Sequence, residues 1–326
     1  MSALIDNYGR VIKDLRISIT PRCNYKCSYC DPLGIIQKDP VGTVTVADID
    51  NVLAAAVELG IESLRFTGGE PLLRQELPEM IALAKQVYKI KDVAITTNAS
   101  LLKRRLPDLL KAGLDRVNIS FDASNPEVFQ KITSGGNIKQ VWEGIDAVVA
   151  AGLQPVKLNA VIMKDINDSE IIGLAELSRE LPYHIRFIEY MHLNNSDSDS
   201  YFKHFVAGKD IKSKIEAKFG QLEKIDNDPS APARLFKVKT WTGAIGFINP
   251  VSEPFCGACS RMRLTSDAKL RPCLLTDREI SVREALDSKK PVEAVIEMFL
   301  LAAHRKVKSG ITVPTNRPRT MVSIGG

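Results

Sequence analysis

Strand-like and helix-like segments alternate along the N-terminal part of the chain, and this alternation restricts the fold more than any other feature of the sequence. Segments of alternating or β-branched residues are separated by stretches of helical periodicity, which is the pattern of a parallel sheet connected by helices. The predicted strands are 15–20, 63–67, 93–97, 116–120, 155–161 and 184–189, and the clearest predicted helices are 46–59, 77–87 and 138–150. Six such strand–helix units predict an incomplete α/β barrel.

The pattern changes after Glu189, where regular strands and helices give way to a more varied segment. It contains a polar loop at 194–200, a predicted helix at 211–219, a proline-containing connection at 226–233, a helix at 292–304 and a basic tail that ends in Gly325-Gly326. We therefore expect two parts, a barrel at 1–193 and a C-terminal extension at 194–326.

The composition is that of an ordinary globular protein with a hydrophobic core. Of the 326 residues, 44% are hydrophobic and 25% are charged, and the formal net charge is only +5. The basic residues are spread along the chain, so we expect a small anionic ligand and no nucleic acid. No apolar run reaches membrane-spanning length, and residues 1–10 contain no signal-peptide core. We expect a soluble, cytoplasmic protein without a membrane partner.

Side chains of opposite character alternate along the predicted strands. Successive side chains of a strand face opposite sides, so Leu15 and Ile17 share one face while Arg16 lies on the other. If the apolar faces pack on the helices, four cations point into the barrel: Arg16, Arg65, Lys157 and Arg186. Any one of them alone is more simply explained as a structural ion pair, but burying four unpaired cations would cost several kcal/mol each. Their shared parity predicts a bound polyanion such as a triphosphate.

Cys23, Cys27 and Cys30 lie directly after the first predicted strand, in the loop where an α/β barrel places its active site. Three closely spaced thiolates suit a cubane iron–sulfur cluster and leave one iron open for an external group. The alternative is a structural zinc ion, but zinc usually takes four protein ligands, and none of the four histidines is nearby in the sequence. The spacing favours the cluster.

A second group of three cysteines, Cys256, Cys259 and Cys273, lies in the C-terminal extension. For this group zinc, with a fourth ligand from elsewhere, is a serious alternative. The six cysteines of the chain divide into three and three with none left over, which favours two sites of the same kind.

Two motifs resemble those of the radical S-adenosylmethionine (SAM) superfamily. One is the first cysteine group, with Tyr29 before its last cysteine, and the other is Gly68-Gly69-Glu70-Pro71 after the second predicted strand. The resemblance implies a partial (β/α)6 TIM-like barrel, a 4Fe-4S cluster on Cys23, Cys27 and Cys30, and cleavage of SAM to a 5′-deoxyadenosyl radical. It also implies that four positions contact SAM, namely Tyr29, Gly69, Ser120 and Met191.

The segment 255–263, with Cys256, Cys259 and the pair Arg261 and Arg263, is similar to one branch of that superfamily, GTP 3′,8-cyclase. This branch catalyses the first step of molybdenum cofactor biosynthesis. The resemblance implies a second 4Fe-4S cluster, held by the second cysteine group in the C-terminal extension and facing guanine. It implies GTP contacts from Arg16, Arg65, Thr96, Lys157, Arg186, Arg261 and Arg263, and catalytic roles for Arg261, Arg263, Gly325 and Gly326. The branch's Thr-Thr-Asn-Gly segment departs here, with alanine at position 99.

The resemblance further implies partners: GTP as substrate, an electron donor such as flavodoxin or ferredoxin, a cyclic pyranopterin monophosphate synthase downstream, and a possible homodimer. Two other hypotheses stay open on the sequence. The first is a radical SAM enzyme that modifies peptides and carries an auxiliary cluster, although such enzymes usually contain more cysteines. The second is a zinc-stabilised nucleic-acid-binding protein, which leaves the inward cations unexplained.

Overall fold

The computed structural model describes residues 3–31, 39–193, 198–310 and 319–325. Its strands form one twelve-stranded sheet in the order β12-β11-β10-β1-β2-β3-β4-β5-β6-β9-β8-β7. The strands are β1 (Asp14–Ser18), β2 (Ser63–Thr67), β3 (Asp92–Thr97), β4 (Arg116–Ser120), β5 (Val156–Ile162), β6 (Tyr183–Glu189), β7 (Glu223–Ile225), β8 (Arg234–Lys237), β9 (Ala244–Ile248), β10 (Arg261–Leu264), β11 (Lys269–Arg271) and β12 (Ile280–Ser281).

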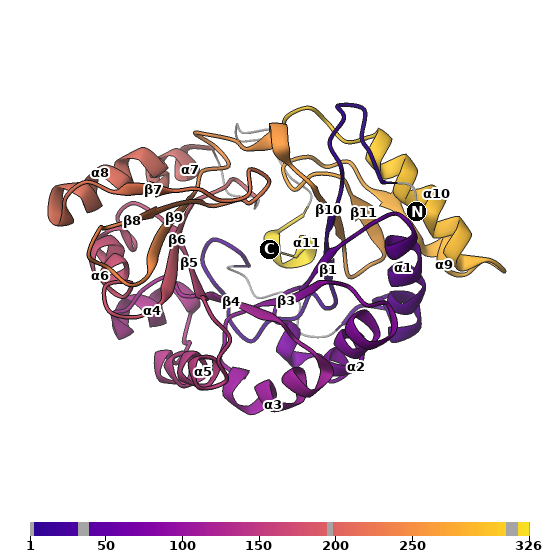
Figure 1. The fold of residues 1–326 in the computed structure, drawn as a ribbon, viewed down its shortest axis with the longest axis horizontal. Coiled ribbons are helices and arrows are strands. Elements are labelled where there is room, and N and C mark those ends of the chain that lie inside the picture. The colour runs from indigo at the N-terminus through magenta and orange to yellow at the C-terminus, as the bar shows by residue number, and fades with distance from the viewer. Residues whose placement is uncertain (1–2, 32–38, 194–197, 311–318, 326) are drawn as a thin grey trace.

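Strands β1 to β6 pair in parallel and in sequence order, as the alternating pattern predicts. The strands curve around a central space, and the helices that connect them lie outside (Figure 1). The partial-barrel prediction is confirmed. The helices are α1 (Val46–Glu58), α2 (Leu77–Ala82), α3 (Leu102–Ala112), α4 (Pro126–Thr133), α5 (Ile138–Ala150), α6 (Ile171–Glu176), α7 (Ser198–His204), α8 (Gly208–Phe219), α9 (Arg283–Leu286), α10 (Pro291–His304) and α11 (Met321–Ile324).

Local sequence explains where several of these helices begin and end. Thr45 and Asp48 form a capping box at the start of α1, in which each side chain accepts a hydrogen bond from the other residue's backbone N–H. Asn137 caps α5, and Gly113 ends α3 in the left-handed conformation (φ +103°) that favours glycine. The predicted helix at 77–87 is α2 followed by a π-helical turn at Leu83–Val87. The polar loop predicted at 194–200 differs in part, since α7 begins at Ser198, and 194–197 lie outside the described residues.

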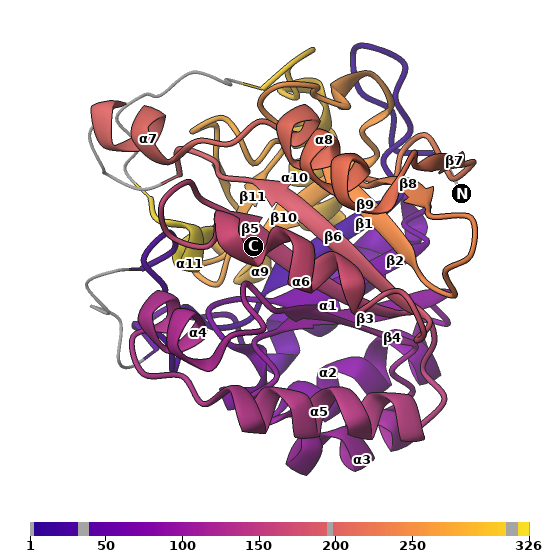
Figure 2. The same ribbon diagram turned by 90° about the vertical axis from the view of Figure 1, so that its left-hand side faces the viewer.

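The C-terminal extension continues the sheet of the barrel at both of its edges. Strand β9 pairs in parallel with β6, and β10 pairs in parallel with β1, so that eight neighbouring strands run in the same direction. Helix α10 packs against α1 and also contacts β11. The turned view shows both parts of the chain sharing one sheet (Figure 2). The division at residue 193 therefore stays a prediction from the sequence.

The two faces of the barrel strands differ as the parity argument requires. Leu15, Ile17, Leu64 and Phe66 are buried toward the helices. On the opposite face, Arg16 lies level with Arg65 of β2 and with Arg263 of β10. A layer of cations thus crosses from the predicted barrel to the extension.

No helix among the described residues is long and apolar enough to span a membrane.

Candidate functional site

A cavity of about 290 Å³ lies inside the barrel, near the lower end of the range of roughly 300–1,000 Å³ that is typical of ligand pockets. All six cysteines line it, together with ten other predicted site residues: Arg16, Tyr29, Arg65, Gly69, Thr96, Ser120, Arg186, Met191, Arg261 and Arg263. Lys157 and Gly325 are not among the lining residues, although both are linked to it, as described below. Gly326 lies outside the described residues.

The first cysteine group sits in the loop that follows β1. The backbone N–H of Tyr25 donates to Cys23 Sγ at 3.4 Å, and Asn98 Nδ2 approaches the same sulfur at 3.9 Å. Burial raises the pKa of the Cys23 thiol to about 11. Burial also raises the pKa of Cys27, as do the nearby Asp122, Cys30 and Cys23. The bare thiolates of Cys23 and Cys27 are thus disfavoured, and a positively charged metal group would stabilise them.

Gly68 and Gly69 pack directly on the backbone that leads into the cysteine loop. A Cβ atom on Gly69 would lie 2.2 Å from the carbonyl oxygen of Arg22, and one on Gly68 would lie 2.3 Å from that of Thr20. Gly69 N–H and Glu70 N–H donate to these same backbone oxygens, Gly69 to Thr20 at 2.8 Å and Glu70 to Arg22 at 2.7 Å. The structure therefore gives the Gly-Gly pair a packing role, because only glycine allows this approach.

Glu70 ties the β2 loop to the β3 loop. Its carboxylate is fully buried and accepts hydrogen bonds from Thr97 Oγ1 and from the backbone N–H groups of Asn98 and Leu72, at 2.7 to 3.0 Å. Burial raises the pKa of Glu70 to about 7. Beside it, Ala99 has φ +61°, so alanine adopts a left-handed conformation that favours glycine, the residue that the resemblance described above implies at this position.

Asp122 is a cavity residue that the sequence analysis missed. It accepts hydrogen bonds from Tyr29 Oη and from Val161 N–H, both at 2.8 Å, and burial raises its pKa to about 6. Its signal was present in the sequence, because it continues the inward parity of Asn118 and Ser120 just beyond β4. Asp122 therefore fixes the ring of Tyr29, one of the predicted SAM contacts.

The second cysteine group is held by two buried cations that the sequence analysis also missed. Lys306 Nζ donates to the carbonyl oxygens of Arg261 at 2.8 Å and Pro272 at 2.5 Å, next to Cys259 and Cys273 along the chain. Arg10 donates to the carbonyl oxygens of Cys256 at 2.7 Å and Val307 at 2.6 Å. Burial alone would raise the pKa of Cys259, but the charges of Lys306 and Arg261 lower it to about 7. Within the described ranges, no three His, Cys, Asp or Glu side chains could hold a single metal ion.

The predicted cations converge inside the barrel. Burial lowers the pKa of Arg16 to about 9 and that of Arg65 to about 10, and repulsion from neighbouring arginines adds to the effect, so both remain charged at neutral pH. Arg186 is buried, donates to Asn118 Oδ1 at 2.7 Å, and has its pKa lowered to about 9 by burial and by Arg116 and Arg16. Among the residues that the structure describes, the buried Nε atoms of Arg16, Arg65 and Arg186 have no hydrogen-bond partner.

Lys157 faces the same interior from β5. Burial and the charges of Arg116, Arg186 and Arg65 lower its pKa to about 7. A polyanion in the cavity would satisfy the open guanidinium groups and relieve the repulsion among them. The predicted anion site is therefore compatible with this chain's own side chains.

The chain matches two family models, the Radical SAM superfamily over residues 17–178 and Molybdenum Cofactor Synthesis C over residues 183–310. It is 41% identical over 323 residues to a GTP 3′,8-cyclase of Thermodesulfovibrio yellowstonii, covering 98% of this chain and 99% of the relative. It is 39% identical, with the same coverage, to a GTP 3′,8-cyclase of Alkaliphilus oremlandii.

The chain belongs to the GTP 3′,8-cyclase family. This family lies within the radical SAM superfamily, whose members use SAM and a 4Fe-4S cluster, and the chain is therefore a radical SAM enzyme. The membership decides against the peptide-modifying and nucleic-acid-binding hypotheses. Among solved structures, Streptococcus suis SuiB bound to S-adenosylmethionine shares the fold, with a TM-score of 0.58 and 15% identity over 97% of this chain and 76% of SuiB.

Gly69→Ala should destabilise the protein by at least about 2 kcal/mol, because the added Cβ would overlap the Arg22 backbone, which cannot move aside as a flexible side chain would. Urea unfolding of the metal-free protein measures this effect without involving the cluster. The matched control is Gly173→Ala in α6, where the Cβ would meet Ser124 Oγ at an ordinary 3.4 Å. This control should change stability by no more than about 1 kcal/mol. Equal stability of the two variants would contradict the packing role.

Proposed function

We propose that this chain converts GTP to (8S)-3′,8-cyclo-7,8-dihydroguanosine 5′-triphosphate in the first step of molybdenum cofactor biosynthesis. The observation that supports this most directly is that one cavity is lined both by the two cysteine groups and by buried guanidinium groups with open Nε donors. Proteins about 40% identical over nearly the whole chain are named for this reaction.

In this proposal Cys23, Cys27 and Cys30 would hold the first 4Fe-4S cluster, beside which SAM would bind. When bound, the cluster and SAM together supply a 5′-deoxyadenosyl radical that removes hydrogen from C3′ of GTP. Tyr29, Gly69, Ser120 and Met191 line the cavity and would orient SAM. The hydrogen bond between Tyr29 and Asp122 limits the positions that the tyrosine ring can take.

The cations would bind the triphosphate and thereby place the ribose. Arg16 and Arg65 lie at the same level on neighbouring strands, and Arg186 and Lys157 approach from β6 and β5. Charge-assisted hydrogen bonds from guanidinium groups to phosphate are strong and directional, so a bound nucleotide would be held in one register. C3′ of the ribose must lie close to the 5′-deoxyadenosyl group and then to C8 of guanine before the radical is quenched. Positioning the nucleotide is therefore the main contribution of the protein.

The extension would bind the guanine end of the substrate. Arg261 is buried, and its Cζ lies 4.6 Å from the centre of the Phe255 ring. Its Nη2 donates to the carbonyl oxygen of Ser230 at 3.2 Å, so two contacts orient the guanidinium plane. Arg263 is buried beside Arg16. We propose that Thr96 also contacts GTP and that Cys256, Cys259 and Cys273 hold a second 4Fe-4S cluster facing guanine. Gly325 and Gly326 would steer the radical step from the C-terminal side.

The proposal includes partners that complete the reaction in the cell. A one-electron donor such as flavodoxin or ferredoxin would reduce the first cluster, and a cyclic pyranopterin monophosphate synthase would consume the product. Dimer formation is a further expectation.

Anaerobic turnover with GTP, SAM and dithionite tests the proposed function. We expect 5′-deoxyadenosine and a GTP-derived product of unchanged mass to form together. With GTP deuterated at C3′, deuterium should appear in 5′-deoxyadenosine. Formation of 5′-deoxyadenosine without a cyclised product under these conditions would contradict the proposed substrate.

Anaerobic reconstitution should load about eight iron atoms per chain, because each cysteine group would hold a four-iron cubane. Replacing Cys256, Cys259 and Cys273 together by alanine should reduce the content to about four, measured by iron and sulfide analysis. The matched triple variant of Cys23, Cys27 and Cys30 should lose the same amount. Retention of all iron in the first variant, or zinc in the wild type, would exclude the second cluster.

GTP binding should take up a proton near pH 7. Lys157 has a pKa of about 7 in the free protein, and a triphosphate would raise it by favouring the charged amine. The complex thus binds more protons, so affinity should fall as the pH rises above 7. Calorimetry in buffers of different ionisation enthalpy measures the uptake, and Lys157→Arg, which stays charged, should abolish it while retaining binding. Unchanged uptake in this variant would exclude Lys157 as its source.

A further inference from the structure

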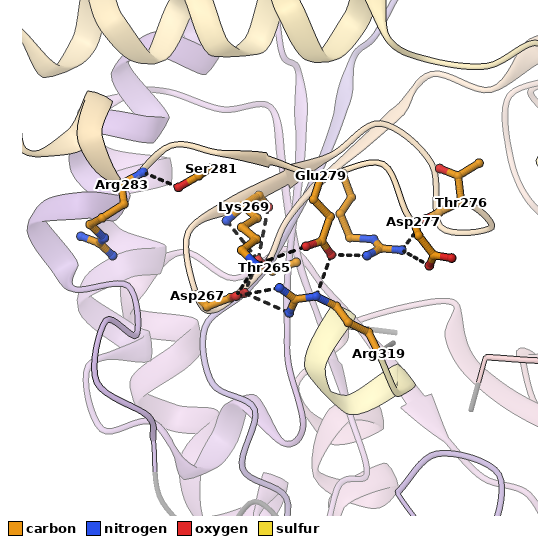
Figure 3. Close-up of polar contacts among 10 residues, drawn as sticks. Thr265, Asp267, Lys269, Thr276, Asp277, Glu279, Ser281, Arg283 and Arg319 are labelled. Atoms are coloured by element: carbon orange, nitrogen blue, oxygen red, sulfur yellow. Dashed lines mark hydrogen bonds and ion pairs between the residues drawn. The ribbon is translucent and has the colours of Figure 1, made fainter. Parts of the chain in front are cut away.

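The C-terminal segment 319–325 is held at two points by one hairpin, formed by β10 and β11 and the residues around them. At the N-terminal end of the segment, Arg319 donates two hydrogen bonds to Asp267 in the turn of the hairpin, from Nη2 to Oδ2 at 2.7 Å and from Nη1 to Oδ1 at 3.1 Å. Arg319 Nε lies 2.7 Å from Glu279 Oε1 (Figure 3). At the C-terminal end of the segment, Arg263 Nη1 donates to the carbonyl oxygen of Gly325 at 2.9 Å.

The carboxylates that receive Arg319 are themselves held in place. Thr265 Oγ1 donates to Asp267 Oδ1 at 2.6 Å, and Glu279 pairs with the fully buried Arg271. Lys269 Nζ lies 3.4 Å from Asp267 Oδ2 and 3.4 Å from Glu279 Oε2. Burial would raise the pKa of Asp267, but the hydrogen bonds from Arg319 and Thr265 lower it to about 2. Asp267 therefore stays charged at neutral pH, and Thr265 and Arg271 help to hold the two carboxylates that bind Arg319.

Between the two points, the segment fits closely into the barrel. Val322 and Ile324 of α11 are buried, and α11 lies in the centre of the strands (Figure 1). Gly325 has φ +83°, and a Cβ atom there would lie 2.8 Å from Ser18 Cβ and 2.9 Å from Thr67 Cγ2. Gly325 thus touches the ends of β1 and β2, which carry the cysteine loop and the Gly-Gly motif. A side chain cannot fasten this residue, so its position depends on contacts elsewhere in the segment.

We propose that Arg319 is a positioning residue, whose ion pairs with Asp267 and Glu279 anchor the C-terminal segment so that its glycine end stays at the reaction centre. The inference deepens the proposed function and depends on it for its catalytic consequence. Arg319, Asp267 and Glu279 do not line the cavity. An effect of Arg319 on the reaction therefore reaches the cavity either through the segment that it anchors or through the hairpin that carries Arg263, and the double-mutant cycle below separates these two routes.

A double-mutant cycle distinguishes this role from a general structural one. Arg319→Ala, a chain lacking residues 325–326, and the combination of both are compared in anaerobic turnover, with cyclised product and 5′-deoxyadenosine measured together. Arg319→Ala should lower the yield of product per 5′-deoxyadenosine at least about tenfold, equivalent to 1.4 kcal/mol, while the affinity for GTP changes little. In the truncated chain the same substitution should have no further effect, because the two changes act through one element. Arg319→Lys should restore part of the yield.

Carboxypeptidase digestion of the reconstituted protein, kept anaerobic and without GTP and SAM, measures the anchoring without turnover. The C-terminus of Arg319→Ala should be removed faster than that of the wild type. The matched control is Arg283→Ala, which removes an ion pair to Asp48 of 3.1 Å in the same region without touching the segment. The control should digest and turn over like the wild type.

Additive losses in the cycle, or unchanged digestion of Arg319→Ala, would overturn the anchor. If wild type and control both digest slowly but form no cyclised product, the proposed function is wrong, and the anchoring is still decided by the digestion rates.

Discussion

Positive charge buried inside a parallel barrel is the constraint on which the rest of this structure depends. The interior of such a barrel is normally filled with branched aliphatic side chains. Here Arg16, Arg65 and Arg186 occupy it with buried Nε donors that have no partner in the described part of the chain. Unpaired buried cations lower the folding stability until an anion binds. The fold therefore favours binding of a charged ligand over maximal stability.

The extension completes this charged interior by strand pairing. Strand β10 adds to the free edge of β1 in a register that sets Arg263 beside Arg16. Strand β9 adds in the same direction to the other edge, on β6. Parallel pairing at both edges buries strands that would otherwise be exposed. The segment matched by the Molybdenum Cofactor Synthesis C model is therefore part of the barrel wall as well as the carrier of a cysteine group.

Outside the charged interior, cations serve a second purpose, which is to fasten loops. Arg10 and Lys306 donate to carbonyl oxygens beside the second cysteine group, and Arg319 fastens the C-terminal segment through carboxylates. The two kinds of acceptor affect the charge of the bound cation differently. Carbonyl oxygens leave the positive charge of Lys306 available to the neighbouring thiols, whereas the carboxylates of Asp267 and Glu279 neutralise Arg319 at a distance from the cavity. The same residue types thus have separate roles that burial and partner define.

Local patterns determined much of this protein. The period of two along the barrel strands located β2 and β4 residue for residue and identified the inward cations, because strand parity is a property of the backbone. Cysteine spacing located both groups, since it is a local property. Strand β9 was missed because its buried sequence, Ala-Ile-Gly-Phe-Ile, has no polar and apolar alternation, and β10 was missed because its four alternating residues are too few to predict a strand. Asp122 was missed although it continues the inward parity of Asn118 and Ser120. Lys306 and Arg319 were missed because their roles come from distant partners: Arg319 meets Asp267 across 52 residues of chain. Only the tertiary structure could decide these contacts, because a charged side chain has no sequence signal for the partner that folding brings to it.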